Sequence, residues 1–207
     1  MSRLPPAVVL ALVALAAAGL AVLVHGLTAE TVTAHERAAL EARLQQVLPA
    51  SAYDNRMYAD CTRALDPELL GSPAPQPVYR ARRQGRPAGL VLMAVAPDGY
   101  SGAIGLMIGV APDGRLSGVR VTSHQETVGL GDKIDIRRSD WITGFAGKSL
   151  TDPAASGWKV KPDGGEFDAF TGATVTPRAV VTAVAKALDY VNRHQDELFA
   201  APNLCQE

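Results

Sequence analysis

Seven residues in the last fifth of the 207-residue sequence have types and spacing suited to holding a phosphate. They run from Asp168 to Thr174 and read DAFTGAT. Gly172 and Ala173 are small and leave the Thr174 hydroxyl exposed just ahead of an expected helix. The free N–H groups and the dipole at a helix N-terminus stabilise negative charge. A phosphate on Thr174 is therefore electrostatically favoured.

A helix is expected directly after this segment. Thr176 is a suitable N-cap, and Pro177 suits the first helical position because its φ is fixed and its missing N–H is not needed there. We expect the helix to run to about His194. Its apolar positions predict one stripe that faces a sheet, formed by Val180, Val184, Leu188 and Val191.

Four apolar runs between residues 77 and 122 predict an antiparallel sheet, because turn residues separate each run from the next. Two of the connections contain Pro-Asp-Gly, a sequence suited to tight turns. The predicted class is α+β, an antiparallel sheet packed with helices and preceded by one N-terminal transmembrane helix. The runs lie near 78–82, 88–95, 102–110 and 115–122.

Residues 7–24 are eighteen uncharged residues, which at about 1.5 Å per residue nearly cross a bilayer core of roughly 30 Å. Arg3 precedes this run, whereas Glu30 and Glu36 follow it. This charge bias favours a single-pass protein of a bacterial inner membrane with its C-terminal domain in the periplasm. A cleaved signal peptide is the competing interpretation, although residues 24–27 offer no small-x-small cleavage site.

We expect three segments along the chain. Residues 1–30 form the membrane anchor, and residues 31–76 comprise an amphipathic helix that Pro49 ends, followed by an irregular approach segment. Residues 77–207 form the main domain. The helix is indicated by apolar residues at helical spacing among charged ones, namely Leu40, Leu44, Val47 and Leu48.

Charge and cysteine content exclude some classes of function. The 20 Lys and Arg residues nearly balance 21 Asp and Glu residues, so no broad positive field favours nucleic acid. Cys61 and Cys205 belong to no metal-binding cluster, so no metal site is expected. Outside the cytoplasm the two cysteines could form a disulfide, and two unpaired thiols are the other possibility.

The segment Asp168–Thr174 resembles the FMN-binding domain family, whose flavin attachment pattern is Asp-x-x-Ser/Thr-Gly-Ala-Thr. Every specified position is present. The resemblance covers about residues 77–192 and is close to the G subunits of Rnf (Rsx) electron transport complexes, which are related to the C subunits of sodium-translocating NADH:quinone reductases. It also rests on GYSG at 99–102, HQETVGLGDK at 124–133, Trp141, and GGEFDAFTGATVT at 164–176.

The resemblance implies that Thr174 carries covalent FMN through its phosphate. In the family a separate flavin transferase makes this phosphodiester from FAD with Mg²⁺, so Thr174 is modified and is not a catalytic nucleophile. It also implies that residues 77–207 form a periplasmic FMN-binding domain. The domain would relay electrons beside other membrane subunits of a complex that couples ferredoxin or NAD(H) chemistry to ion movement, without substrate turnover of its own.

Two groups of residues are expected to contact the flavin. Near the attachment point these are Thr171, Gly172, Ala173, Val175 and Thr176. The second group lies in the loop after the sheet, where glycines allow backbone N–H groups to approach a ligand: Glu126, Thr127, Gly129, Leu130, Gly131 and Lys133. Trp141 could cover the ring by stacking or could only anchor local packing.

Two other functions remain open from the sequence. A stand-alone membrane-tethered flavin reductase would need a substrate cavity beside the flavin ring. A non-redox assembly module would leave Thr174 unmodified and would use its apolar stripes to bind membrane partners.

Overall fold

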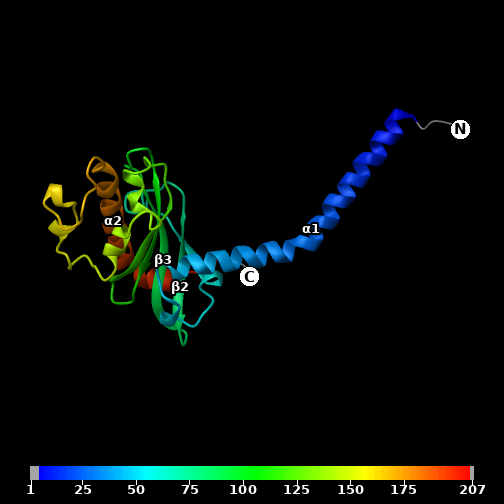
Figure 1. Cartoon of the computed structure of the whole chain (residues 1–207). Coiled ribbons are helices and arrows are strands. Elements are labelled where there is room, and N and C mark those ends of the chain that lie inside the picture. The colour runs from blue at the N-terminus through cyan, green and yellow to red at the C-terminus, as the bar shows by residue number, and fades with distance from the viewer. Residues whose placement is uncertain (1–4, 206–207) are drawn as a thin grey trace. The chain divides into compact units, whose positions relative to one another are not determined.

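The computed structural model describes residues 5–205, apart from the side chains of residues 29 and 30. Arg3, on which the predicted orientation depends, lies outside the described residues. The chain divides into two units between Leu40 and Glu41. Along the chain come α1 (Pro6–Gln45), β1 (Cys61–Ala64), β2 (Gln76–Arg83), β3 (Arg86–Ala96), β4 (Ile104–Val110), β5 (Leu116–Ser123) and α2 (Val175–Ala200), with short 3-10 turns between them (Figure 1).

Helix α1 joins the expected membrane segment and the expected amphipathic helix into one element of 40 residues, drawn as a continuous coil in Figure 1. No proline interrupts residues 7–45, and the single Gly26 near the junction costs a helix only about 1 kcal/mol. Its portion Pro6–Thr28 has a mean hydropathy of 2.9 and is a candidate membrane span. The helix ends at Gln45, a few residues before Pro49.

The five strands form one antiparallel sheet in the order β1-β2-β3-β4-β5. The four predicted strands and the α+β class are confirmed. Strand β1 was missed, since it lies within the stretch predicted to be irregular. Its four residues include Thr62 and Arg63, too short and polar a run to stand out, and it forms because Cys61 pairs with Tyr79 of β2.

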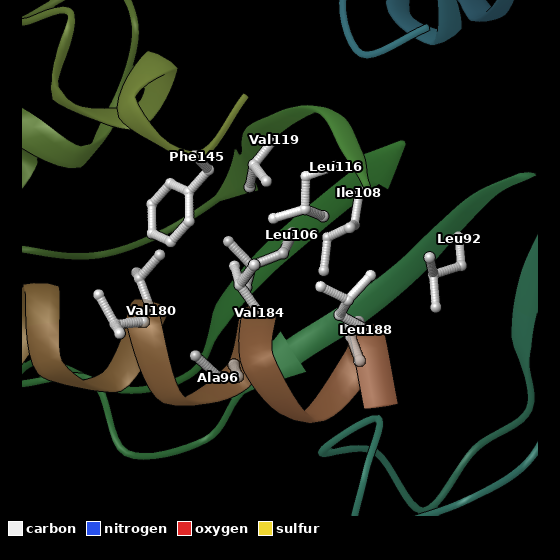
Figure 2. Close-up of a cluster of buried hydrophobic side chains, with 14 of the residues drawn as sticks. Leu92, Ala96, Leu106, Ile108, Leu116, Val119, Phe145, Val180, Val184 and Leu188 are labelled. Carbon is white, nitrogen blue, oxygen red and sulfur yellow. The ribbon is translucent and has the colours of Figure 1, made fainter. Parts of the chain in front are cut away.

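Helix α2 covers one face of the sheet. Figure 2 shows its Val180, Val184 and Leu188 pointing toward side chains of β3, β4 and β5, among them Leu106 and Ile108. All five side chains have 0% exposed surface, so the predicted apolar stripe is confirmed. The helix continues to Ala200, beyond the predicted end near His194, because Pro202 is the first residue after it that cannot continue a helix.

The opposite face of the sheet carries the segment that follows α1. The Ser117 hydroxyl donates a hydrogen bond of 2.6 Å to the Val47 carbonyl. Gly109 of β4 faces the same carbonyl, and a Cβ added at Gly109 would lie 2.4 Å from its oxygen. Leu44, Val47 and Leu48 are buried, so the end of the expected amphipathic helix is part of the core.

A disulfide between Cys61 and Cys205 ties the C-terminal tail to β1, which decides between the two alternatives that the sequence left open. Asn203 supports this connection, because its side-chain oxygen accepts a 3.0 Å hydrogen bond from the Cys61 N–H and its amide donates to the Ala59 carbonyl at 2.7 Å. The disulfide closes a sequence separation of 144 residues. It therefore restricts most of the chain in the unfolded state.

Replacing both cysteines, as Cys61→Ser with Cys205→Ser, should lower the free energy of unfolding by about 2 to 5 kcal/mol, because the unfolded chain regains the entropy that the cross-link removes. Thermal unfolding of the full chain in detergent, followed by circular dichroism, measures the loss. Reductant should destabilise the wild type to a similar extent and leave the double variant unchanged. Equal stability of oxidised wild type and double variant would contradict this role.

Candidate functional site

A tight turn presents the attachment threonine. The Ala173 N–H donates a 3.0 Å hydrogen bond to the Phe170 carbonyl, which closes a four-residue turn. Gly172 is the third residue of that turn and has a φ of +81°. Type II turns need a positive φ at this position, which glycine adopts without steric cost. The turn therefore leads the chain from the buried Phe170 directly into Thr174 and α2.

Thr174, and not Thr176, is the residue at which α2 begins. The helix starts at Val175, and the Thr174 side chain makes no capping hydrogen bond. The prediction that Thr176 caps the helix and Pro177 occupies its first position is wrong. Pro177 is the third helical residue, which is tolerated because first-turn N–H groups have no partner within the helix.

Thr176 is displaced from the capping role because its hydroxyl has another partner. It donates a hydrogen bond to the Oε2 atom of Glu126, and Thr176 and Glu126 are only 1% and 5% exposed. The other carboxylate oxygen, Oε1, accepts a 3.0 Å hydrogen bond from the Ser101 N–H. One buried carboxylate thus joins the loop after β3, the loop after β5 and the first turn of α2.

The loop after β5 is held by its own polar contacts. The Asp132 carboxylate accepts a 2.8 Å hydrogen bond from the Gly129 N–H, and its backbone N–H donates to the Thr127 carbonyl at 3.3 Å. Gly131 packs against the buried carboxylate. A Cβ there would lie 2.8 Å from both Glu126 Oε2 and Thr176 Oγ1, so only glycine fits between them.

These three segments surround a cavity of about 290 Å³. Apolar side chains on its wall remain accessible, since Tyr100, Leu130 and Val175 are 71%, 41% and 39% exposed. It is lined by Tyr100, Glu126, Thr127, Leu130, Gly131, Gly172, Ala173, Thr174, Val175 and Thr176.

The residues around this cavity fit FMN. An exposed threonine hydroxyl stands where a phosphate would be attached. The N–H groups of Val175 and Thr176 start the helix and have no carbonyl one turn earlier to bond with, so they are available to phosphate oxygens. The exposed apolar wall suits an aromatic ring system, because burying that surface is favourable.

The remaining residues with an expected flavin contact lie outside the cavity lining. Thr171 is exposed in the turn, and Gly129 and Lys133 are exposed on the loop. Trp141 lies beneath the attachment segment, where its indole N–H donates a 2.9 Å hydrogen bond to the Asp168 carbonyl. Its ring also packs edge-on against Phe170, with centroids 5.2 Å apart.

Tyr100 and Ser101 belong to the site, although neither was predicted to contact the flavin. Tyr100 lines the cavity, and the Ser101 N–H binds the Glu126 carboxylate. Their signal was present in the GYSG stretch at 99–102, which carried part of the family resemblance. Its proximity to residue 126 is a property of the folded chain.

The Glu126→Ala variant should be destabilised by about 2 to 4 kcal/mol, because the Ser101 N–H and the Thr176 hydroxyl would lose their buried acceptor. Hydrogen exchange at the Ser101 amide should accelerate, and chemical denaturation of the full chain measures the stability. Glu68→Ala removes an exposed carboxylate and should change stability by less than about 0.5 kcal/mol. Equal behaviour of the two variants would show that Glu126 does not hold the segments together.

Comparisons with known proteins agree with this geometry. Residues 99–189 match the FMN-binding domain family, and residues 4–47 match the RnfG N-terminal region. The chain is 48% identical to the G subunit of the ion-translocating oxidoreductase complex of Vibrio atlanticus, covering 95% of this chain and 94% of the relative. The corresponding G subunit of Pseudomonas aeruginosa is 50% identical, with coverage of 96% and 93%. The chain therefore belongs to the family of ion-translocating oxidoreductase complex G subunits and contains that family's FMN-binding domain.

Proposed function

We propose that this chain carries FMN as a phosphodiester on Thr174 and relays electrons as one subunit of a membrane-bound ion-translocating complex coupling ferredoxin or NAD(H) chemistry to ion movement. The observation that carries the proposal is the exposed Thr174 hydroxyl, free of any capping hydrogen bond, at the start of a 26-residue helix and beside a cavity with an apolar wall. The relatives named as subunits of ion-translocating oxidoreductase complexes support the setting.

Attachment requires a separate flavin transferase that uses FAD and Mg²⁺. The Thr174 oxygen forms a bond to the phosphorus of the FMN half, the bond from that phosphorus to the bridging oxygen breaks, and AMP leaves. The hydroxyl proton is released. Asp168 begins the attachment motif and its side chain is 70% exposed, although it pairs with Lys161 at 2.6 Å, so the transferase could reach it.

Once FMN is attached, this chain's residues hold it in place. The N–H groups at the start of α2 stabilise the phosphodiester charge, and Tyr100, Leu130 and Val175 provide apolar surface for the ring. Flavin supplies the redox chemistry, since it accepts two electrons and can release them one at a time. The covalent bond retains the cofactor in a compartment from which a free one would diffuse away.

The proposal also places residues 41–207 on the periplasmic side of the inner membrane. The Cys61–Cys205 disulfide supports this orientation, because disulfides persist in the periplasm and are rare in the reducing cytoplasm. The candidate span Pro6–Thr28 would serve as the single membrane anchor.

Thr174→Ala should abolish covalent flavin while leaving the fold intact, because Thr174 is exposed and makes no side-chain cap. After co-expression with a flavin transferase, intact mass should show an addition of FMN less water in the wild type only. Thr171→Ala is the matched control, since it removes an exposed hydroxyl three residues earlier and should keep the flavin.

Retention of in-gel flavin fluorescence by Thr174→Ala, or mapping of the flavin peptide to Thr171 or Thr176, would refute the attachment site. A wild type that stays unmodified beside an active transferase would favour the assembly module. Steady turnover of a small acceptor by the isolated, flavin-loaded chain would favour the stand-alone reductase.

Protease added to spheroplasts should digest residues 41–207 of the wild type, since the proposed orientation exposes them to the periplasm. Immunoblotting against the C-terminus measures the digestion, and a cytoplasmic protein checks that the spheroplasts stay intact. Protection of the domain until the membrane is lysed would show the opposite orientation. A mature N-terminus near residue 28 would instead show that the apolar segment is a cleaved signal peptide.

A further inference from the structure

A second cavity, of about 330 Å³, is open on the face of the sheet that α2 does not cover. Met107 lies on its floor, because it alternates along β4 with Leu106 and Ile108, which face the helix. None of the residues that line the flavin cavity lines this one. Its lining comes from the end of α1, from β4 and β5, and from the loop after β5: Arg43, Gln46, Met107, Arg120, Val121, Thr122, Asp135, Ile136 and Arg137.

Three arginines and one carboxylate give this lining an excess of two positive charges. The carboxylate of Asp135 is already neutralised, since its Oδ2 accepts a 3.0 Å hydrogen bond from Arg137 Nε. This contact, followed by smaller effects, lowers the pKa of Asp135 to about 2. Asp135 therefore stays charged at neutral pH and remains engaged by Arg137.

Arg43 and Arg120 are left without an acidic partner. Within residues 5–205, neither guanidinium lies in an ion pair. Arg120 is only partly exposed, and one of its N–H groups donates to the Val119 carbonyl at 2.7 Å, which fixes the side chain in place. A guanidinium has five N–H donors, and a partly buried charge is normally paired. This arrangement is suited to an anion that binds from outside.

We propose that this cavity is a binding site for a phosphate monoester dianion. Two guanidinium groups from separate elements match the two charges of such a group, which carries between −1.5 and −2 at about pH 7. Their planar N–H forks fit phosphate oxygens in bidentate fashion. The apolar atoms of Met107, Val121 and Ile136 then contact the carbon body of the ligand. The phosphate could belong to a lipid headgroup or to a soluble monoester.

The site can be tested with phenyl phosphate, titrated calorimetrically into the full chain in non-ionic detergent. The chain is expressed without a flavin transferase, so the result does not depend on flavin loading. We expect saturable binding of one ligand. Arg43→Ala and Arg120→Gln should each weaken Kd by about tenfold or more, because each removes charge-assisted hydrogen bonds.

Arg86→Ala is the matched control, since Arg86 is exposed at the start of β3 and does not line the cavity. It should bind phenyl phosphate as the wild type does, and so should Thr174→Ala. Phenol, which lacks the phosphate, should not bind. Near-ultraviolet circular dichroism checks that Arg120→Gln is folded, and Arg43→Ala, at an exposed helix end, tests the site independently.

Nanodiscs distinguish the two sources of phosphate. If phosphatidate in the disc competes with phenyl phosphate and phosphatidylcholine does not, the site takes a lipid headgroup, whereas binding unaffected by either lipid assigns it to a soluble monoester. Absence of saturable binding would overturn the proposal. So would equal affinities of Arg43→Ala, Arg120→Gln and Arg86→Ala, or loss of binding in Thr174→Ala, which would place the phosphate at the start of α2.

Discussion

The buried carboxylate of Glu126 is the contact on which the candidate flavin site depends. Its two oxygens hold the Ser101 N–H and the Thr176 hydroxyl, which belong to segments 25 and 50 residues away in the sequence. A buried charge is costly unless it is hydrogen-bonded, so these contacts also restrict which arrangements of the three segments are stable. Thr174 is positioned as a consequence, because it lies two residues before Thr176.

The sheet supports different chemistry on its two faces. On one face, α2 buries its apolar stripe and presents its N-terminus at the flavin cavity. On the other, the segment after α1 lies across Gly109 and Ser117, which leaves part of the surface near Met107 open. The flavin attachment point and the arginine-lined cavity are therefore built from separate residues and can be altered independently.

The end of the chain is secured by contacts that also involve the edge strand. Arg80 of β2 pairs with Asp60 at 2.6 Å and donates to the carbonyl of Leu198 near the end of α2. The disulfide and Asn203 hold the following tail to β1. Strand β1 thus owes its position to residues at the opposite end of the sequence, so local pattern alone gave little sign of it.

The sequence by itself determined the apolar segment, four of the strands, the stripe of α2 and the attachment motif, because each is a local pattern of hydrophobicity or residue type. The motif also indicated FMN through its resemblance to a known family. Tertiary structure decided what depends on distant partners: the pairing of β1, the disulfide, and the start of α2 at Val175, with Thr176 drawn to Glu126 and away from capping. A hydroxyl such as that of Thr176 can cap a helix or bind a side chain, and only the folded chain shows which acceptor lies within reach.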